Sequence, residues 1–363
     1  MLHRRTVLKT GAAAVAVAAI GKFSAARAEG GFAPKPGSWR DFEIRTRIEL
    51  APSKGAARVW VPTPSFAADA WTRPGETRFT SNADDARLAQ EPAGMVVAEW
   101  KNGSAAPVLE VVSRVSTRDR AVELTGSSET LSGADRTLYL APTAHVPTDG
   151  IVKTRADEIV GARTSDVEKA RAIYEWVVEN TFRDAKVRGC GLGDVKTMLE
   201  SGNLGGKCAD INALYVGLAR AAGLPARDVY GLRVAPSKFG YKSLGANSET
   251  VTKAQHCRAE VWLDGAGWVP VDPADVRKVA LEEPPTKLAM DDPKVVAARK
   301  ALFGSWETNW IAYNDAHDVK LPGSEAGPLG FFMYPQAETV AGLLDCLDPD
   351  GFRYSITARE VTA

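Results

Sequence analysis

One stretch, residues 205–223, constrains the fold more than any other part of the chain. It reads GGKCADINALYVGLARAAG, a glycine-rich turn followed by a run with a helical hydrophobic pattern. Its apolar side chains recur at the i, i+3, i+4, i+7 spacing of a helix with one buried face. Gly223 predicts the end of that helix, and Pro225 follows at the distance expected beyond a helix end. The stretch therefore predicts a helix that begins near Cys208.

Cys208 lies in the first turn of this predicted helix, three residues before Ile211 and on the same apolar stripe. We therefore expect its side chain to point inward. Unpaired N–H groups and the helix dipole favour a thiolate at the start of a helix. Cys208 is a candidate nucleophile if a base can reach it.

A base occurs in residues 256–273, HCRAEVWLDGAGWVPVDP, where two short β-prone runs flank a glycine-containing turn. His256 begins the first predicted strand and Asp272 ends the second. A His can remove the proton of a thiol, and an Asp can orient the imidazole and stabilise its cation. Cys208, His256 and Asp272 are therefore the predicted catalytic residues of a thiol acyl-transfer site.

The length of the hairpin loop decides whether Asp272 can reach His256. Residues of even number share one face of the first strand, so Asp272 must point to that face. A two-residue loop would pair Asp272 with Ala259 and turn it away, whereas a three-residue loop would pair it with Arg258, diagonal to His256. We expect an odd-length loop or a bulge. With a regular two-residue turn, Asp275 would be the nearest substitute for Asp272.

The segments GKCADINALYVGLARAAGLPAR and HCRAEVW…GWVPVDP, in the order Cys, His, Asp, resemble bacterial members of the transglutaminase-like superfamily. The resemblance covers roughly residues 150–280. It implies that Cys208 is the nucleophile, His256 the base and Asp272 the orienting acid. It also implies an α+β fold with a papain/transglutaminase-like core, in which a helix carrying the Cys packs on an antiparallel sheet carrying the His and the Asp.

Comparison with the family pattern also concerns residues outside the predicted triad. Family members often carry a small residue and a Trp just after the His, and here Cys257 and Arg258 stand there. The lining of the substrate groove is therefore expected to depart from the pattern. Arg227, after the Gly-Leu-Pro-Ala turn, is carried over only as a structural residue.

Residues 29–148 predict a β-rich N-terminal domain of the β-sandwich type. Residues 42–50 alternate between apolar and polar, and 58–62 follows a turn, so that a hairpin is expected between them. This part has no group of His, Cys or paired acids, and we interpret it as a scaffold or a substrate-positioning domain. Further strands are predicted over 95–101, 108–116 and 137–141.

The catalytic core is expected over residues 149–290. A capping box of Ser165 and Glu168 predicts a helix that continues to about residue 181. A second short helix is predicted over 195–200, followed by a stop at Gly202.

Two loops and a C-terminal segment complete the predicted organisation. The glycine-rich turn 189–193 is expected to form a wall of the groove, and the polar loop 238–253 to overhang it. Asp210, early in the Cys208 helix, is interpreted as a capping charge rather than a catalytic acid. Residues 291–363 are expected to be an extension that packs on the core and extends its sheet.

The N-terminus predicts export. Arg4 and Arg5 begin a twin-arginine signature, a weakly apolar run follows, and an A-x-A site predicts cleavage after Ala28. The expected location is the periplasm of a bacterium, with no integral membrane segment in the mature form. Without residues 1–28 the chain keeps 40 basic against 45 acidic side chains, a balance that does not favour nucleic acid as a partner.

No cofactor motif occurs, and we predict neither a cofactor nor a metal. A zinc site made of Cys190, Cys208, His256 and Cys257 lacks any C-x-x-C or H-x-x-x-H spacing. No calcium loop supports a calcium-activated crosslinking enzyme. If Cys208 is free, the other three cysteines, among them Cys346, allow at most one disulfide, and the sequence does not choose the pair.

The sequence favours a periplasmic cysteine-dependent amide hydrolase or acyltransferase that works through a thioester. Its substrates would be peptides or proteins, with the peptide stems of the cell wall among the candidates. The sequence does not choose between hydrolysis and transamidation, although water makes hydrolysis the default. It also singles out no second donor for the oxyanion beside the backbone of Cys208. The alternative is a catalytically silent binding module or an envelope assembly factor on the same fold.

Overall fold

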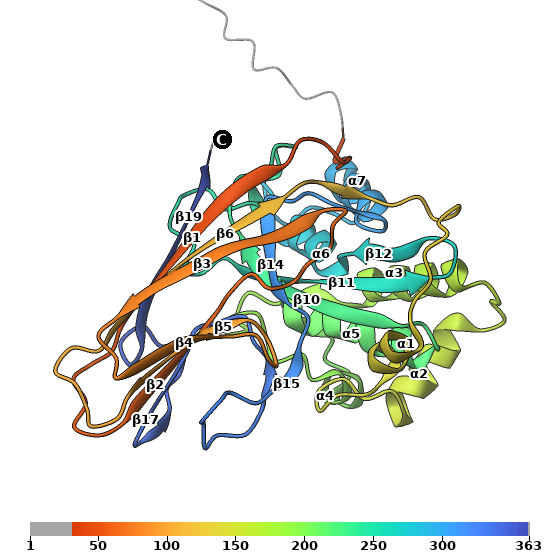
Figure 1. Cartoon of the computed structure of the whole chain (residues 1–363). Helices are drawn as coiled ribbons and strands as arrows, with labels where there is room; N and C mark the ends of the chain where they lie inside the picture. The colour runs from red at the N-terminus through yellow and green to blue at the C-terminus, as the bar shows by residue number, and fades with distance from the viewer. Residues whose placement is uncertain (1–30, 362–363) are drawn as a thin grey trace, which may run out of the picture.

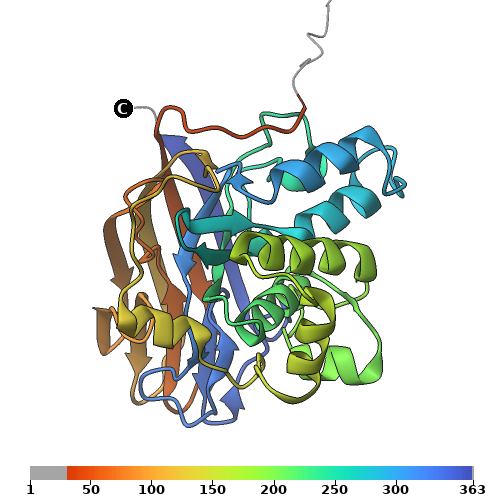
Figure 2. The same ribbon diagram turned by 90° about the vertical axis from the view of Figure 1, so that its right-hand side faces the viewer.

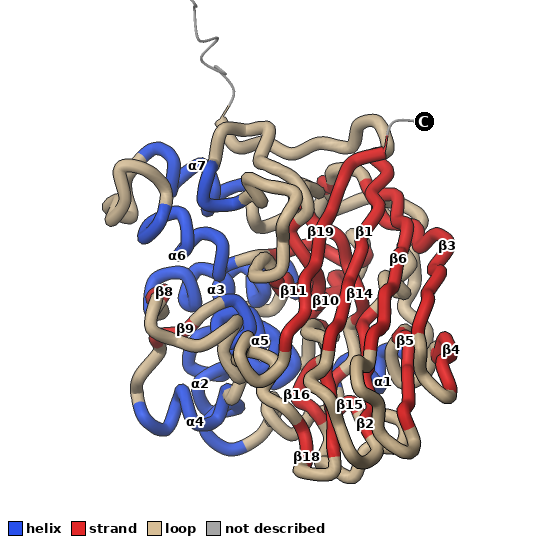
Figure 3. Tube along the Cα trace, turned by 90° about the vertical axis from the view of Figure 1, so that its left-hand side faces the viewer, coloured by secondary structure: helices blue, strands red, loops and turns tan. Residues whose placement is uncertain are grey.

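The structure is a computed structural model that describes residues 31–361, so the predicted signal peptide over 1–28 lies outside the described residues. A layer of antiparallel strands packs against a layer of helices, and a four-stranded sheet lies where the two meet (Figure 1, Figure 2). Figure 3 shows the same division, with the helices on one side and the long strands on the other. Within residues 31–361, no helix has both the length and the hydropathy that crossing a membrane requires.

Two antiparallel sheets make up the predicted β-sandwich. One hydrophobic cluster contains residues of both sheets, among them Ile48, Val59, Ala98 and Leu109. The first sheet has the order β19 (Arg353–Val361), β1 (Arg40–Glu49), β6 (Val108–Thr117), β3 (Thr72–Ser81). The second has the order β18 (Gly342–Leu343), β17 (Gln336–Thr339), β2 (Ala57–Pro62), β5 (Met95–Trp100), β4 (Asp85–Ala89).

The alternation predicted over residues 42–50 is confirmed in β1, where Phe42, Ile44 and Ile48 are buried and Arg45 and Arg47 are exposed. The predicted hairpin between β1 and β2 is wrong. β1 pairs with β6 and β19, and β2 pairs with β5 and β17. The turn after β1 carries the chain from one sheet to the other, so that the apolar faces of the two strands meet across the sandwich instead of side by side.

The strand predicted over 137–141 is also wrong, because residues 137–140 form the end of helix α1 (Gly133–Leu140). Ser132 caps this helix by accepting a hydrogen bond from the N–H of Asp135 at 3.0 Å. A capped start and a tertiary contact to the core outweigh the β preference of the Thr-Leu-Tyr-Leu sequence.

The core sheet has the order β12 (Gly267–Val271), β11 (Gln255–Leu263), β10 (Ala226–Arg233), β14 (Trp310–Asn314), with antiparallel pairing throughout. The other elements of the described residues are helices and short strands. The helices are α2 (Gly150–Val160), α3 (Asp166–Asn180), α4 (Val195–Ser201), α5 (Cys208–Ala221), α6 (Pro273–Glu282), α7 (Pro293–Ala301) and the 3₁₀ turn Lys242–Leu244. The short strands are β7 (Arg120–Ala121), β8 (Phe182–Arg183), β9 (Gly205–Gly206), β13 (Ser305–Trp306), β15 (His317–Val319) and β16 (Leu329–Phe331).

The predicted helices are confirmed with their end signals. Ser165 accepts from the N–H of Glu168 at the start of α3, and α4 ends at Gly202, which has a φ of 70°. Helix α5 differs from expectation because all of its residues are buried, not only one face. Small residues on its outer side allow this: a Cβ at Gly217 would lie 3.2 Å from Val146 and 3.3 Å from Val195.

The C-terminal segment contributes to both layers. β14 extends the core sheet, as the sequence suggests for residues 291–363. β17 and β19 instead join the two sheets of the sandwich, beside β2 and β1. Three aromatic side chains of this segment are buried in the hydrophobic clusters: Trp306, Trp310 and Tyr313.

Candidate active site

Cys208 is the first residue of α5, where the sequence places it, and its side chain is buried. A short parallel pairing of β8 with β9 leads the chain into this helix. The backbone N–H of Cys208 has no hydrogen-bond acceptor within residues 31–361. It is therefore a free donor beside the sulfur.

Asp210 fixes the surroundings of Cys208. One of its oxygens accepts from the N–H groups of Leu192 and Gly193, both at 2.9 Å, and the other accepts from the N–H of Lys207 at 2.9 Å. The turn before α4 is thereby held against the start of α5. Gly191 makes this approach possible, because its φ is +94° and a Cβ there would lie 1.8 Å from the Asp210 carboxylate. Asp210 is thus a positioning residue, in addition to the capping charge that the sequence suggests.

The hairpin of β11 and β12 has the three-residue loop that the triad requires. Leu263 pairs with Gly267, so residues 264–266 form the loop, and the register continues to Ala259 opposite Val271. The same register sets the next residue, Asp272, opposite Arg258 and on the face of His256. The predicted odd-length loop is confirmed.

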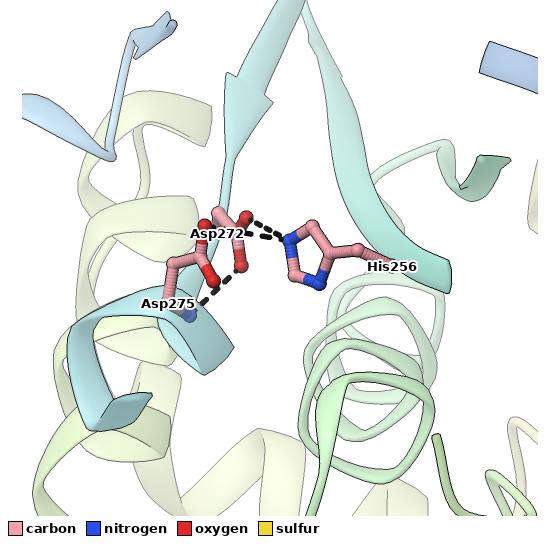
Figure 4. A group of neighbouring side chains, drawn as sticks. All are labelled: His256, Asp272 and Asp275. Atoms are coloured by element: carbon pink, nitrogen blue, oxygen red, sulfur yellow. Dashed lines mark hydrogen bonds and ion pairs between the residues drawn. The ribbon is translucent and has the colours of Figure 1, made fainter. Parts of the chain in front are cut away.

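His256 faces two carboxylates (Figure 4). Its Nε2 lies 2.8 Å from Asp272 Oδ2 and 3.4 Å from Asp275 Oδ2. Asp272 is also the N-cap of α6 and accepts from the N–H of Asp275 at 3.0 Å. Asp275 is therefore a second partner of the ring rather than a substitute for Asp272. Because Nε2 is committed to the acids, Nδ1 is the nitrogen left for the thiol.

Asn212, one turn after Cys208 on α5, holds the orienting acid from the other side. Its Nδ2 donates to the carbonyl of Cys257 at 2.9 Å and to Asp272 Oδ1 at 3.3 Å. The helix that carries the thiol, the strand that carries the imidazole and the start of α6 are thereby linked through one buried amide. Sequence reasoning gave Asn212 no role.

Two buried guanidinium groups balance the two acids. Arg233 of β10 pairs with Asp275 at 2.5 Å, and Arg258 lies 3.4 Å from Asp272. Burial favours the neutral acid, but the charge of Arg233 holds the pKa of Asp275 well below its usual range. Burial and then the charge of Asp275 raise the pKa of Asp272. The hydrogen bond of 2.8 Å makes Asp272 the group that orients the ring, while Asp275 supplies the fuller negative charge.

Arg258, one of the two departures from the family pattern, lies behind the site instead of in the groove. Its guanidinium lies 5.4 Å from the ring centre of Trp306 and 4.9 Å from that of Trp310. Its Nη1 donates to the carbonyl of Glu307 at 2.9 Å. The residue thus supports Asp272 from the core side.

Neighbouring groups change the pKa of Cys208. The thiols of Cys190 and Cys257 and then the ring of His256 lower it well below its usual range, against the effect of burial. The contact with Cys208 and burial raise the pKa of Cys190, and burial followed by the same contact raises that of Cys257. The two neighbours therefore stay protonated beside the thiolate of Cys208.

His256 is held as the cation that complements this thiolate. Burial and the charge of Arg233 lower its pKa, but Asp275 and Asp272 together outweigh them and raise it to about 9. A thiolate and an imidazolium can then coexist over a wide range of pH below 9. This is the charge state that an activated cysteine needs.

A cavity of about 510 Å³ opens onto Cys208 and His256. The predicted wall is present, since Gly189 and Cys190 line it, and the loop 238–253 contributes Gly245, Thr252 and Lys253. A further wall comes from Tyr334 and from residues 346–354, which sequence reasoning did not connect with the site.

Gln255, the residue before His256, also lines this cavity and was missed from the sequence. Its side chain is buried, and its Nε2 has no hydrogen-bond partner within residues 31–361. A buried amide donor without a partner is costly, so that its position in the cavity lining calls for a role.

The only three side chains in residues 31–361 whose possible ligand atoms all lie within 4.8 Å of one another are His256, Asp272 and Asp275. The zinc set considered from the sequence, which includes Cys190 and Cys257, does not form such a group. Arg233 and Arg258 already contact the two carboxylates, so a metal ion there would face two guanidinium charges.

Comparison with known proteins agrees with this geometry. Residues 153–273 match the family model of the transglutaminase-like superfamily. Over 328 residues the chain is 38% identical to an uncharacterized protein of Haemophilus influenzae, an alignment that covers 85% of this chain and 88% of that protein. The chain belongs to the transglutaminase-like superfamily.

One of the solved structures of low identity shares the fold. The crystal structure of a proposed cysteine protease from Cytophaga hutchinsonii is 13% identical, with a TM-score of 0.53 over 91% of this chain and 93% of that one. The periplasmic domain of TgpA from Pseudomonas aeruginosa is 19% identical over 68% of this chain and 73% of that domain, with a TM-score of 0.34 that is too low to support an argument. The first likeness extends the shared fold beyond the residues that match the superfamily model.

Proposed function

We propose that this superfamily member is a cysteine-dependent amide hydrolase or acyltransferase with Cys208, His256 and Asp272 as its catalytic triad. The observation that carries the proposal is the set of contacts at His256. One ring nitrogen lies 2.8 Å from Asp272, and the other side of the ring faces a thiol whose pKa is lowered. Such an arrangement supports nucleophilic attack and general acid catalysis by adjacent groups.

In the first half of the reaction, the Cys208 thiolate attacks the carbonyl carbon of an amide. The C–S bond forms while the C=O electrons move to the oxygen. The tetrahedral intermediate collapses, the C–N bond breaks, and His256 gives its Nδ1 proton to the leaving amine. The product is a thioester on Cys208 and a free amine. Asp272 keeps the ring in the orientation that makes this transfer possible.

In the second half, neutral His256 takes a proton from water, and the oxygen of that water attacks the thioester. The C–S bond breaks, a carboxylic acid leaves, and the thiolate and the imidazolium are restored. An amine in place of water would yield a new amide instead. The cavity opens to solvent, which supports hydrolysis as the default.

The developing oxyanion would be bound by the N–H of Cys208 and by the side-chain amide of Gln255. Both residues line the cavity, and both donors lack acceptors within residues 31–361. Donors that are already in position cost no reorganisation when the charge appears.

The twin-arginine signature at Arg4 and Arg5 supports export to the periplasm. The amide substrates of that compartment include peptides, proteins and the peptide stems of the cell wall. We propose peptide amides as the substrate class.

Alkylation by iodoacetamide tests the thiol site without a known substrate. The rate at Cys208 is measured against pH for the mature protein and for His256→Ala, with the modified residue identified by peptide mass mapping. We expect fast labelling well below about pH 8 in the wild type and a large decrease in the variant. Slow labelling that rises only near the ordinary thiol pKa of about 8.5 would indicate the silent binding module instead.

Gln255→Leu tests the oxyanion assignment separately. Acylation by p-nitrophenyl acetate passes through an oxyanion, whereas alkylation by iodoacetamide does not. We expect acylation to decrease by about 10²-fold, with the alkylation rate within about twofold of the wild type. Equal losses in both reactions would assign Gln255 to the thiolate or to the fold and not to the oxyanion.

A further inference from the structure

The cavity at Cys208 has a strongly asymmetric charge. Six of the residues that line it are Arg or Lys, and none is Asp or Glu. The chain as a whole has no such excess, since Lys and Arg together equal Asp and Glu in number. The lining cations are Arg183, Arg188, Lys207, Arg233, Lys253 and Lys278.

The three arginines of this lining are neutralised by acids outside the cavity. Arg233 pairs with Asp275 at 2.5 Å, and Arg188 pairs with Asp345 at 2.8 Å. Arg183 pairs with Glu282. These three groups therefore contribute little net charge to a ligand in the cavity.

The three lysines are not neutralised in this way. Within the described residues, Lys207 and Lys253 form no ion pair, and Lys278 has only a loose contact of 3.9 Å to Glu282, which also binds Arg183. Lys278 is largely enclosed, with a side chain that is 18% exposed. Burial and the neighbouring charge of Arg233 lower the pKa of Lys278 to about 8. An anion that binds beside the amine raises its pKa and so opposes both effects.

Another part of the cavity lining is apolar and aromatic. Tyr334, Leu347, Phe352 and Tyr354 line it, and all four come from the C-terminal part of the chain. A ligand in the cavity would thus contact both hydrocarbon or aromatic surface and ammonium groups. An uncharged peptide would leave the lysines without partners, and a cationic one would be repelled by them.

We infer that this cavity is a subsite for a carboxylate, so that the preferred substrate is a peptide with a carboxylate within a few bonds of the amide that Cys208 attacks. The lysines at 253 and 278 bind the anion, and the C-terminal wall packs on its carbon chain. The inference rests on the proposed function, because it assigns a specificity to the same site. The carboxylate can be an acidic side chain or the free end of the peptide.

Two alkylating reagents of nearly the same shape test the subsite. Iodoacetate carries a carboxylate, and iodoacetamide carries a neutral amide at the same position. Both react with the same thiolate, so the ratio of their rates at Cys208 cancels any change in thiolate reactivity. An ordinary thiolate repels the anionic reagent, which gives a ratio below one. We expect a ratio above one for the wild type, with a decrease at high salt.

Substitutions of the lysines show which of them cause the preference for the anionic reagent. In the double variant Lys253→Gln/Lys278→Gln we expect the ratio to decrease about tenfold, and in Lys253→Gln alone about threefold. Lys300→Gln is the matched control, because Lys300 is exposed on α7 and does not line the cavity. A wild-type ratio below one that the double variant does not change overturns the inference and leaves the proposed function standing. Labelling of Cys208 by neither reagent counts against the proposed function.

If neither reagent labels Cys208, calorimetry tests whether the cavity binds a carboxylate independently of the thiol. Three ligands are compared on Cys208→Ala: N-acetylglutamine, its isomer N-acetylisoglutamine, and the neutral N-acetylglutamine amide. Tighter binding of either isomer than of the neutral amide supports the subsite. The isomer that binds better tells whether a terminal or a side-chain carboxylate is recognised. Equal binding of all three, or binding of none, overturns the inference.

Discussion

The thiol of Cys190 is predicted to lower the pKa of Cys208, and Cys190→Ala should reverse that effect. Cys190 is 6% exposed, and its S–H faces two acceptors, the Cys208 sulfur and the carbonyl of Gln255 at 3.3 Å. The charged sulfur is the stronger acceptor. Replacement by Ala leaves the thiolate with the donors Cys257 and His256 only.

The size of the change follows from one hydrogen bond. A bond to a charged acceptor contributes about 1.5–3 kcal/mol, and an S–H is a weak donor, so we take about 1.4 kcal/mol. One pKa unit corresponds to about 1.36 kcal/mol. The midpoint of the alkylation profile of Cys208 should therefore move up by about one pH unit in Cys190→Ala.

The assay is the rate of iodoacetamide labelling at Cys208 over a pH range from about 4 to about 10, which brackets the ordinary thiol pKa. Cys190→Ser is the matched variant, because its hydroxyl keeps a donor at the same place, and its midpoint should stay at or below that of the wild type. A midpoint in Cys190→Ala within about 0.2 pH units of the wild type would refute the reasoning, since one hydrogen bond predicts a change several times larger. Equal changes in the Ala and the Ser variants would also refute it.

Three further predictions concern the supports of the site and of the core. Gly191→Ala should lower the free energy of unfolding by about 2–4 kcal/mol and slow the labelling of Cys208, because the φ of +94° is strained for Ala and the new Cβ would collide with Asp210. Urea unfolding measures the stability and alkylation by iodoacetamide measures the labelling rate. Wild-type values in both measurements would contradict the prediction. Asn212→Ala should cost about 1–3 kcal/mol and slow acylation by p-nitrophenyl acetate, because the variant lacks the amide that donates to Asp272; an unchanged acylation rate would show that the amide does not position the acid. Asp228→Asn should stabilise the protein at high pH, because burial raises the pKa of Asp228 to about 7 and its oxygens lack hydrogen bonds within residues 31–361. Because folding raises the pKa of Asp228, the wild type has its full free energy of unfolding below the unfolded pKa of about 4 and loses part of it as the pH rises to about 7. In guanidinium unfolding the variant should therefore match the wild type at about pH 4 and exceed it by about 2–4 kcal/mol at about pH 8. A difference that does not vary with pH would contradict this.

Much of the site was predictable because local rules determine it. The helical pattern after Cys208 and the stop at Gly223 set the position of the thiol. The parity of the hairpin loop set the face of Asp272 relative to His256. Both inferences depend only on residues that are close in the sequence.

The parts that were missed depend on contacts between distant segments. Arg233 reaches Asp275 from another strand, and Cys190 reaches Cys208 from a separate turn. No pattern in the sequence pairs such residues. Gln255 was missed for a different reason, because an amide without a partner is recognisable only when its surroundings are known.

In the β-sandwich, too, contacts between distant segments could not be predicted from local patterns. The strands β1, β2, β5 and β6 were predicted in place, but their partners were not, since β19 and β17 come from the far end of the chain. Helix α1 was mistaken for a strand because a four-residue run of Thr, Leu and Tyr has a β preference that a cap at Ser132 overrides.

The pairing of β1 with β19 joins the first and last strands of the fold, and it has a consequence for synthesis. A ribosome makes β1 long before β19, so the edge of β1 stays open until the final strand has emerged. Phe352, just before that strand, and Tyr354, near its start, also line the cavity at Cys208. Cys208 therefore acquires its complete cavity in the same late step that closes the sheet, and a chain that stops before residue 352 has neither the complete cavity nor the closed sheet.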